Sequence, residues 1–151
     1  MSQSLTQIYL HIVFSTKDRQ AFLTDKKIRE RTHAYLAGTC RNLDCPSLLV
    51  GGVEDHVHLL TRFSKKIAVV DFIAEIKRES SKWVKVQDSS LFSFYWQKGY
   101  GAFSISPAHV EDVKKYIAGQ EEHHRHESFQ DEFRRLCEKY GLEIDERYVW
   151  D

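Results

Sequence analysis

The chain has 151 residues, of which 42% are hydrophobic and 29% charged, and its formal net charge is zero. These values are typical of a globular protein, and we expect residues 1–151 to form a single domain with a sizeable core. No apolar run approaches the roughly 20 residues that a membrane-spanning helix needs, and no signal pattern opens the sequence, so we expect a cytoplasmic protein without a membrane partner. The three cysteines, Cys40, Cys45 and Cys137, are predicted to be buried free thiols.

The charges are unevenly distributed along the chain. Residues 62–86 contain seven Lys or Arg against three Asp or Glu, whereas residues 121–151 contain five against ten. A net charge of zero therefore does not exclude a nucleic-acid partner, because the local potential governs phosphate binding. On charge alone, ordinary solvated helix faces are an equally good interpretation.

The first half of the chain predicts a strand, a helix and a β-hairpin. Apolar residues alternate in "QIYLHIVF" (7–14), which predicts a strand, and a helix capped by Thr24 or Asp25 follows. "SLLVGGV" (47–53) predicts a second strand, whose two glycines indicate a bulge or a close backbone approach. The next strand lies in "GGVEDHVHLLTRF" (51–63), so close behind that the two should form a hairpin.

The second half predicts a helix, a strand and two more helices. Residues 68–86 carry apolar side chains at helical spacing, and "GYGAFSIS" (99–106) predicts a fourth strand after an aromatic-rich loop. The Ser-Pro pair that follows predicts the start of a helix that runs to about His124. Ser128 should cap a last helix that Gly141 can end. The order βαββαβ plus two helices predicts an α+β fold, a ferredoxin-like split βαβ unit with an antiparallel sheet.

Two histidines interrupt the predicted third strand. Strand side chains alternate between two faces, so His56 and His58 share one face with Leu60, whereas Val57 and Leu59 share the other and face the core. Two imidazoles that point the same way can supply two ligands to a divalent cation. The pattern also arises by chance, and a third ligand would have to come from elsewhere in the chain.

Two polar residues lie four positions apart on the helix after Pro107. Tyr116 and Gln120 are therefore neighbours on one helix face. Such residues are usually solvated or packed against a core. If this face met the histidine strand, a phenol nucleophile would lie beside a cation held by imidazole and amide groups.

Taken together, these segments resemble the single-tyrosine HUH transposases of the insertion sequence 200/605 type, in which HUH denotes histidine, a hydrophobic residue and histidine. The resemblance covers nearly the whole chain. It rests on "HIVFSTKDR" in the first strand, "DHVHLL" in the third, "IKRESSKW" on the basic helix, "WQKGYGAFSIS" entering the fourth strand, "VKKYIAGQEEHH" on the tyrosine helix, and the tail from "SFQDEFRRLCEKYGLEID" to "YVW". One departure is Gly101, where a bulkier residue is more usual, and it concerns strand packing and not the chemistry.

The resemblance implies a site and an activity. His56 and His58 match the HUH histidines, Tyr116 the catalytic nucleophile on the C-terminal helices, and Gln120 a third metal ligand. The implied protein is a DNA transposase that acts on single-stranded DNA with hairpin ends, forms a 5′-phosphotyrosine intermediate and then transfers the strand. Members are homodimers, and a centre can combine the histidine pair of one subunit with the tyrosine helix of its partner, for which residues 104–109 would serve as the link.

The residue types fit this chemistry. A divalent cation on the scissile phosphate draws charge from the non-bridging oxygens. A phosphotyrosine keeps much of the free energy of the phosphodiester, so a 3′-hydroxyl can later reseal DNA without ATP. Two imidazoles and one amide oxygen, with no cysteine, suit Mg²⁺ or Mn²⁺ better than a structural zinc ion.

The basic middle of the chain supplies candidates for DNA binding. We expect phosphate contacts from Arg62, Lys65, Lys66, Lys77, Arg78, Lys82 and Lys85. Tyr95 and Trp96 are candidates for stacking on unpaired bases, whereas Trp83 is expected in the core.

Three alternatives remain open. A domesticated relative would process repeated palindromes in its host genome without mobilising itself. A catalytically silent nucleic-acid-binding dimer would share the fold and form no covalent adduct. Finally, "HHRH" (123–126) offers a structural zinc site, but three such histidines cannot all face one way on a regular helix, so a solvated helix end is favoured.

Overall fold

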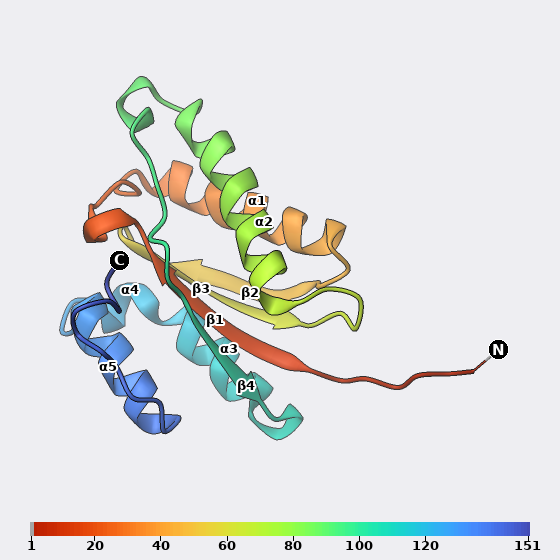
Figure 1. The fold of residues 1–151 in the computed structure, drawn as a ribbon. Coiled ribbons are helices and arrows are strands. Elements are labelled where there is room, and N and C mark those ends of the chain that lie inside the picture. Colours follow the sequence, from red (N-terminus) through yellow and green to blue (C-terminus); the bar gives the residue numbers. More distant parts are fainter. Residues whose placement is uncertain (1) are drawn as a thin grey trace.

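The computed structural model describes residues 2–151 (Figure 1). Its four strands and their helices follow in the predicted order, except that the predicted tyrosine helix is divided into α3 and α4. They are β1 (Tyr9–Ser15), α1 (Lys26–Asn42), β2 (Ser47–Gly52), β3 (His56–Arg62), α2 (Val69–Lys85), β4 (Gly101–Ile105), α3 (Val110–Ala118), α4 (Gln120–His123) and α5 (Phe129–Lys139), with short 3₁₀ turns η1 (Lys17–Arg19), η2 (Ser89–Leu91) and η3 (Pro107–His109) between them.

The four strands form one antiparallel sheet in the order β2-β3-β1-β4. This order places the two central strands, β1 and β3, side by side, with Val13 opposite His58. The ferredoxin-like split βαβ fold is confirmed. The expected hairpin joins β2 to β3, and its bulge lies between Ser47 and Leu49, before the two glycines.

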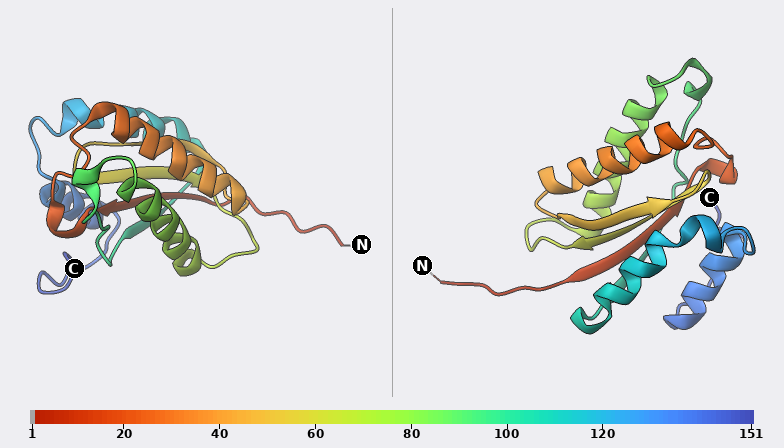
Figure 2. Two further views of the ribbon diagram at one scale, coloured as in Figure 1. Left: turned by 90° about the horizontal axis from the view of Figure 1, so that it is seen from above. Right: turned by 180° about the vertical axis from the view of Figure 1, so that it is seen from behind.

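Helices cover both faces of the sheet. Figures 1 and 2 show α1 and α2 on one face, and α3, α4 and α5 on the other. Each face therefore has its own core, and the side chains of β1 and β3 alternate between them. The face under α3 to α5 receives the odd-numbered side chains of β1 and the even-numbered side chains of β3.

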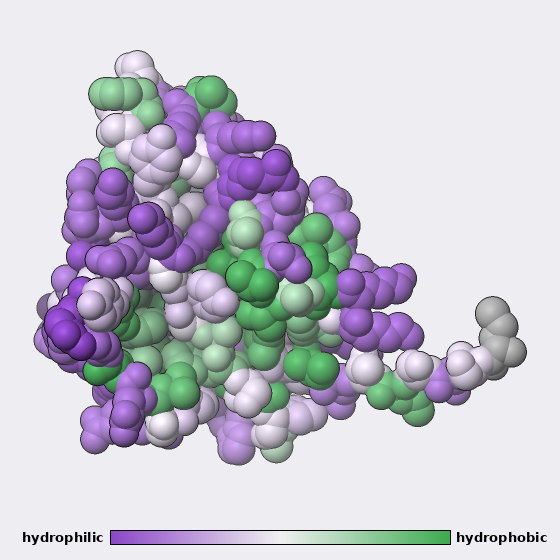
Figure 3. Space-filling view, in the orientation of Figure 1, coloured by the Kyte–Doolittle hydropathy of each residue, from purple (hydrophilic) through white to green (hydrophobic). Residues whose placement is uncertain are grey.

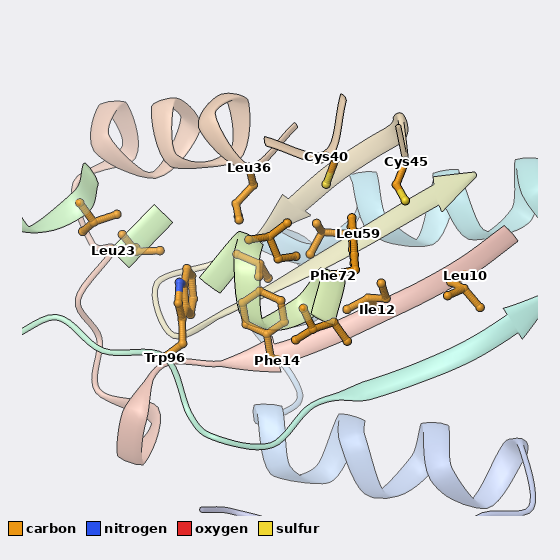
Figure 4. Packing of buried hydrophobic residues seen from close by; sticks show 14 of the residues in the cluster. Leu10, Ile12, Phe14, Leu23, Leu36, Cys40, Cys45, Leu59, Phe72 and Trp96 are labelled. Carbon is orange, nitrogen blue, oxygen red and sulfur yellow. The ribbon is translucent and has the colours of Figure 1, made fainter. Parts of the chain in front are cut away.

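The larger core lies between the sheet and the first two helices. Figure 4 shows Leu10, Ile12 and Phe14 of β1 packed with Leu59 of β3 and Leu36 of α1. Each such side chain, once fully buried, contributes about 1.5–3 kcal/mol to folding. Cys40 and Cys45 belong to this core, and all three cysteines are buried free thiols, as predicted.

The helix starts differ in how they are capped. The side chain of Asp25 accepts a hydrogen bond from Ile28 N, and that of Ser128 accepts one from Asp131 N, as predicted. At the helix start predicted for the Ser-Pro pair, the side chain of Ser106 makes no capping hydrogen bond. Its hydroxyl bonds to the ring of His109 instead, and Pro107 opens a 3₁₀ turn before α3.

The tyrosine helix is also shorter than predicted. It ends at Ala118, and α4 begins at Gln120 after a break at Gly119. The amide of Gly119 is shared between the carbonyl oxygens of Lys115 and Tyr116, a tightened turn that marks the helix end. Despite this break, the side chains of Tyr116 and Gln120 still point to one place, because both donate a hydrogen bond to Glu132 Oε2.

The surface carries both apolar and charged areas. Figure 3 shows apolar residues gathered near the middle of one face, around the edge strand β4 and the start of α2, with hydrophilic residues above them. Within residues 2–151, no helix combines the length and the apolar character needed to cross a bilayer.

Candidate active site on the histidine strand

The alternation of β3 places two histidines in the layer between the sheet and the last three helices. His56 and His58 are both fully buried on this face, whereas Val57 and Leu59 belong to the opposite core. The predicted division of the strand into an apolar face and a histidine face is therefore correct.

The outer nitrogen of each ring is held by a neighbour. His56 Nδ1 lies 2.6 Å from an oxygen of Asp55, and His58 Nδ1 lies 2.8 Å from His11 Nε2. When Nδ1 of each ring donates to these acceptors, both Nε2 atoms present lone pairs to the same interior space. This is the usual way in which a protein orients metal-binding imidazoles.

The tyrosine helix α3 and the short helix α4 after it pack directly over these rings. Gln120 Oε1 lies 3.0 Å from His56 Nε2, and the Tyr116 ring centroid lies 5.8 Å from that of His58. Gly51 makes this approach possible, because a Cβ there would lie 2.8 Å from Ile117 Cγ2 and 2.9 Å from the Ile117 carbonyl oxygen. Tyr116, Gln120 and both histidines therefore meet within one chain.

A carboxylate from α5 occupies the centre of this group. Glu132 is fully buried, and its Oε1 lies 3.0 Å from Nε2 of both His58 and His124. Its Oε2 accepts hydrogen bonds from the Tyr116 hydroxyl and from Gln120 Nε2. Glu132 thus joins the histidines to the tyrosine.

Tyr116 has a second partner on α5. Arg135 Nη2 donates to the Tyr116 oxygen at 2.9 Å, and the same guanidinium is held by Glu127 at 3.1 Å. The phenol therefore donates to a carboxylate and accepts from a guanidinium.

Gly101 allows α5 to lie this close to the sheet. A Cβ at this position would lie 2.8 Å from a ring carbon of Phe133 and 3.0 Å from the ring of Phe103. Gly101, the departure noted in the sequence, thus makes room for Phe133 of α5. The Phe133 ring fills the space that a bulkier residue at position 101 would take.

We expect Gly101→Ala to lower the free energy of unfolding by about 1–3 kcal/mol, the usual cost of overpacking. The control is Gly38→Ala in α1, where a Cβ meets nothing within 4 Å and helix propensity improves by about 1 kcal/mol. Urea denaturation measures the free energy of unfolding of both variants. Equal effects of the two substitutions would contradict this role for Gly101.

Burial and hydrogen bonding shift the pKa values of the site in different directions. Burial lowers the pKa of His58 to about 4 and, together with the neighbouring His58, that of His11 to about 3. Burial also opposes the charged form of His56, but its bonds to Asp55 and Glu132 outweigh this and raise its pKa to about 9.

The carboxylate and the phenol shift in opposite directions. Burial opposes the ionised form of Glu132, but hydrogen bonds with His124, His56 and His58 outweigh it and hold the pKa far below its usual range. Burial and the adjacent Glu132 carboxylate raise the pKa of Tyr116. Without a further cation, the site therefore favours a carboxylate, a protonated His56 and a neutral phenol.

The side chains present fit a divalent cation. One nitrogen each from His56, His58 and His124, and one oxygen of Glu132, all lie within 4.8 Å of one another. Gln120 adds an amide oxygen to the same space. Imidazole nitrogens, a carboxylate and an amide make a mixed donor set of the kind that binds manganese or magnesium.

The prediction of a solvated helix end at residues 123–126 is wrong in part. The side chain of His124 is only 7% exposed and belongs to the central group. His123 lies with Glu127 and Glu132 in a second, more exposed group that could hold an ion, whereas His126 is exposed. The three histidines do not converge on one zinc ion, because His123 and His124 point toward Glu132 whereas His126 points into solvent.

The basic residues proposed for DNA binding are in different environments. Arg62, Lys65 and Lys82 are exposed, and Arg78 is paired with Glu75 and Glu79. The ammonium of Lys77 donates to the carbonyl oxygens of Gln97 and Gly99 at 2.8 and 2.7 Å, and burial lowers its pKa to about 8. We therefore assign Lys77 a structural role.

The aromatic candidates for base stacking also differ. Trp96 is buried and its indole nitrogen donates to Ser80, so it is not available to a base. Tyr95 is 55% exposed, with the ammonium of Lys85 3.9 Å from its ring centre. Trp83 is partly buried and stacks on Tyr35.

His11, Glu132 and Arg135 were not predicted to belong to the site, and His124 was predicted only as part of a possible structural zinc site. A signal existed for three of them. His11 is a polar residue inside an apolar strand, His124 follows Gln120 by one helical turn, and Glu132 falls within the apolar stripe of α5. Arg135 carries no such signal, because its position on the helix surface is ordinary for arginine.

The fold and the site together define a ferredoxin-like protein in which a histidine pair on the central strand faces a helix with a tyrosine. The chain belongs to the IS200-like transposase family, whose model matches residues 4–120. No curated protein sequence matches the chain.

Solved structures support the fold. A protein from Deinococcus radiodurans R1, provisionally described as a transposase, aligns with a TM-score of 0.61 at 18% identity over 80% of this chain and 98% of that one. A REP-associated tyrosine transposase bound to a REP hairpin aligns with a TM-score of 0.51 at 12% identity over 80% of this chain and 70% of that one. At these identities, the likeness is one of fold.

Proposed function

We propose that this transposase is a single-tyrosine HUH enzyme that cleaves and rejoins single-stranded DNA. Tyr116 is the nucleophile, and His56, His58 and Gln120 bind a divalent cation, with Glu132 and His124 as further ligand candidates. The observation that carries this proposal is the meeting of the Tyr116 hydroxyl with the imidazole, amide and carboxylate groups around one buried space.

The chain's own residues perform most of the chemistry. Asp55 and His11 fix the two imidazoles so that their Nε2 atoms face the substrate space. A bound Mg²⁺ or Mn²⁺ supplies Lewis acidity toward the non-bridging phosphate oxygens. Tyr116, held by hydrogen bonds on both sides of its oxygen, attacks phosphorus and gives a 5′-phosphotyrosine and a 3′-hydroxyl.

A tyrosine nucleophile, unlike a water nucleophile, leaves the DNA strand covalently attached to the protein. The phosphotyrosine keeps the energy of the broken phosphodiester, so a 3′-hydroxyl can attack it and restore a DNA strand. We propose single-stranded DNA hairpins as the substrate, with exposed Arg62, Lys65 and Lys82 in contact with phosphates.

We further propose that the protein acts as a homodimer. β4 forms one edge of the sheet, and the apolar area around it in Figure 3 is a surface that a second copy would cover. Tyr116 and the histidine pair of one chain already meet, so a complete centre does not require the partner's helix. Sedimentation equilibrium would measure the association state.

The activity itself is tested by incubating the protein with labelled single-stranded hairpin DNA and Mn²⁺, followed by denaturing electrophoresis. The proposal predicts an SDS-resistant protein–DNA adduct and a free 3′-hydroxyl on the released strand. Hairpin binding without an adduct would identify a catalytically silent nucleic-acid-binding protein and would contradict the proposed enzyme.

The pKa of His56 predicts how cation binding depends on pH. A cation that takes Nε2 of His56 must displace the proton that this ring holds below a pKa of about 9. We therefore expect the apparent affinity for Mn²⁺ to fall about tenfold for each pH unit below 9, with about one proton released per ion at pH 7. Calorimetry in two buffers of different ionisation enthalpy counts this proton, and binding without proton release would contradict the assignment.

A further inference from the structure

A groove of about 630 Å³ leads to the proposed nucleophile. It runs between α3 and α5, and its lining includes Tyr116, Arg135, Lys139 and Tyr140. Its volume is within the range that binds small molecules or part of a polymer chain. Arg135 therefore contacts the hydroxyl of Tyr116 and also lines the groove beside that hydroxyl.

The side chain of Arg135 is fixed in this position. Its Nη2 lies 2.9 Å from the Tyr116 oxygen and also donates to Glu127 Oε1 at 3.1 Å, and its Nε donates to Glu127 Oε2 at 3.3 Å. Glu127 is itself held by His123 at 2.6 Å. Arginine at a bidentate carboxylate loses much of its freedom, so the donor to Tyr116 is already positioned before substrate binds.

The nucleophile needs such a donor. As the Tyr116 oxygen loses its proton, negative charge develops beside the Glu132 carboxylate, which opposes it. Within residues 2–151, Arg135 is the one side chain that donates a hydrogen bond to this oxygen. A guanidinium keeps its charge throughout the physiological range, so the donor is present in every step.

We propose that Arg135 is a catalytic residue of this transposase that stabilises negative charge on the Tyr116 oxygen when the DNA strand is cut and again when it is rejoined. This inference rests on the proposed function of Tyr116 as nucleophile. Arg135 lies outside residues 4–120, the part of the chain that the family model matches.

The step balances as follows. The Tyr116 oxygen forms a bond to phosphorus, the bond from phosphorus to the 3′ oxygen breaks with its electron pair, and one proton passes in net from the phenol to the 3′ oxygen. In rejoining, the 3′ oxygen attacks phosphorus and Tyr116 is the leaving group. The same donor therefore acts in both directions.

The test compares Arg135→Gln and Arg135→Lys with the control Arg134→Gln, whose side chain on the same helix pairs with Asp131 and Glu146 away from Tyr116. The readouts are adduct formation at saturating hairpin DNA and Mn²⁺, rejoining of a preformed adduct by a 3′-hydroxyl strand, and Mn²⁺ affinity in the absence of DNA. Thermal unfolding checks that each variant folds.

We expect Arg135→Gln to slow adduct formation and rejoining by similar factors of about 10²–10³, as for loss of one donor to a developing oxyanion. Arg135→Lys should recover part of both rates, and Mn²⁺ affinity should change by less than about threefold. Arg134→Gln should match the wild type.

Wild-type rates for Arg135→Gln would overturn the inference while leaving Tyr116 as the nucleophile. A defect in Arg135→Gln confined to Mn²⁺ affinity or to hairpin affinity would also overturn it, because the role would then be in binding. An unmodified protein that forms no adduct overturns both the proposed function and this inference.

Discussion

Tyr116→Phe is expected to abolish formation of the covalent protein–DNA adduct while leaving hairpin binding within about threefold of the wild type. The substitution removes the attacking oxygen and its hydrogen bonds with Glu132 and Arg135, but keeps the ring that packs near His58 and His11. Without the phenol oxygen, no bond from residue 116 to phosphorus can form, so the loss should reach the detection limit.

The measurement is denaturing electrophoresis with end-labelled hairpin DNA, combined with a binding titration by fluorescence anisotropy. A matched control is Tyr140→Phe, because Tyr140 lines the same groove and stacks on Phe103, but its hydroxyl is not among the hydrogen-bond partners of Glu132. An adduct formed at the wild-type rate by Tyr116→Phe would place the nucleophile on another residue.

His56→Ala should remove Mn²⁺ binding and DNA cleavage together. The ring is fully buried and contacts Asp55, Gln120 and Glu132, so its loss takes away one ligand and leaves the Glu132 carboxylate poorly compensated. Since loss of even an outer partner of a metal site costs 10–100-fold in affinity, we expect a decrease of about 100-fold or more.

Calorimetry would measure Mn²⁺ affinity, and the adduct assay would measure cleavage. His126→Ala provides the control, because His126 is exposed and belongs to neither group that could hold an ion. His56→Gln, which keeps polar bulk in the site, separates loss of the ligand from collapse of the fold. Cleavage that still responds to Mn²⁺ in His56→Ala would remove the histidine pair from the mechanism.

The sheet and its histidine face could be predicted from sequence because they depend on a local rule. Because side chains alternate along a strand, His56 and Val57 lie on opposite faces of the sheet whatever the rest of the chain does. The i,i+4 relation of Tyr116 and Gln120 is local in the same way, and it survives the break at Gly119.

The contribution of α5 could not be predicted in this way, because it depends on how far a distant helix can approach the sheet. Glu132 lies at the centre on a helix whose neighbouring Phe133 packs against Gly101, more than thirty positions earlier in the chain. The contact between Arg135 and Tyr116 could not be predicted either, because an arginine on a helix surface is ordinary. The same holds for Lys77, because a count of charges does not show that backbone carbonyls bind its ammonium group.

The proposed mechanism depends most on a cation bound between the histidine strand and the tyrosine helix. Anomalous scattering from a crystal soaked in Mn²⁺ locates that ion directly. The proposed mechanism predicts a peak between Nε2 of His56 and Nε2 of His58, within reach of Gln120 and Glu132 and next to the Tyr116 hydroxyl. A peak only at the outer group of His123 and Glu127, with the histidine pair unliganded, would contradict it.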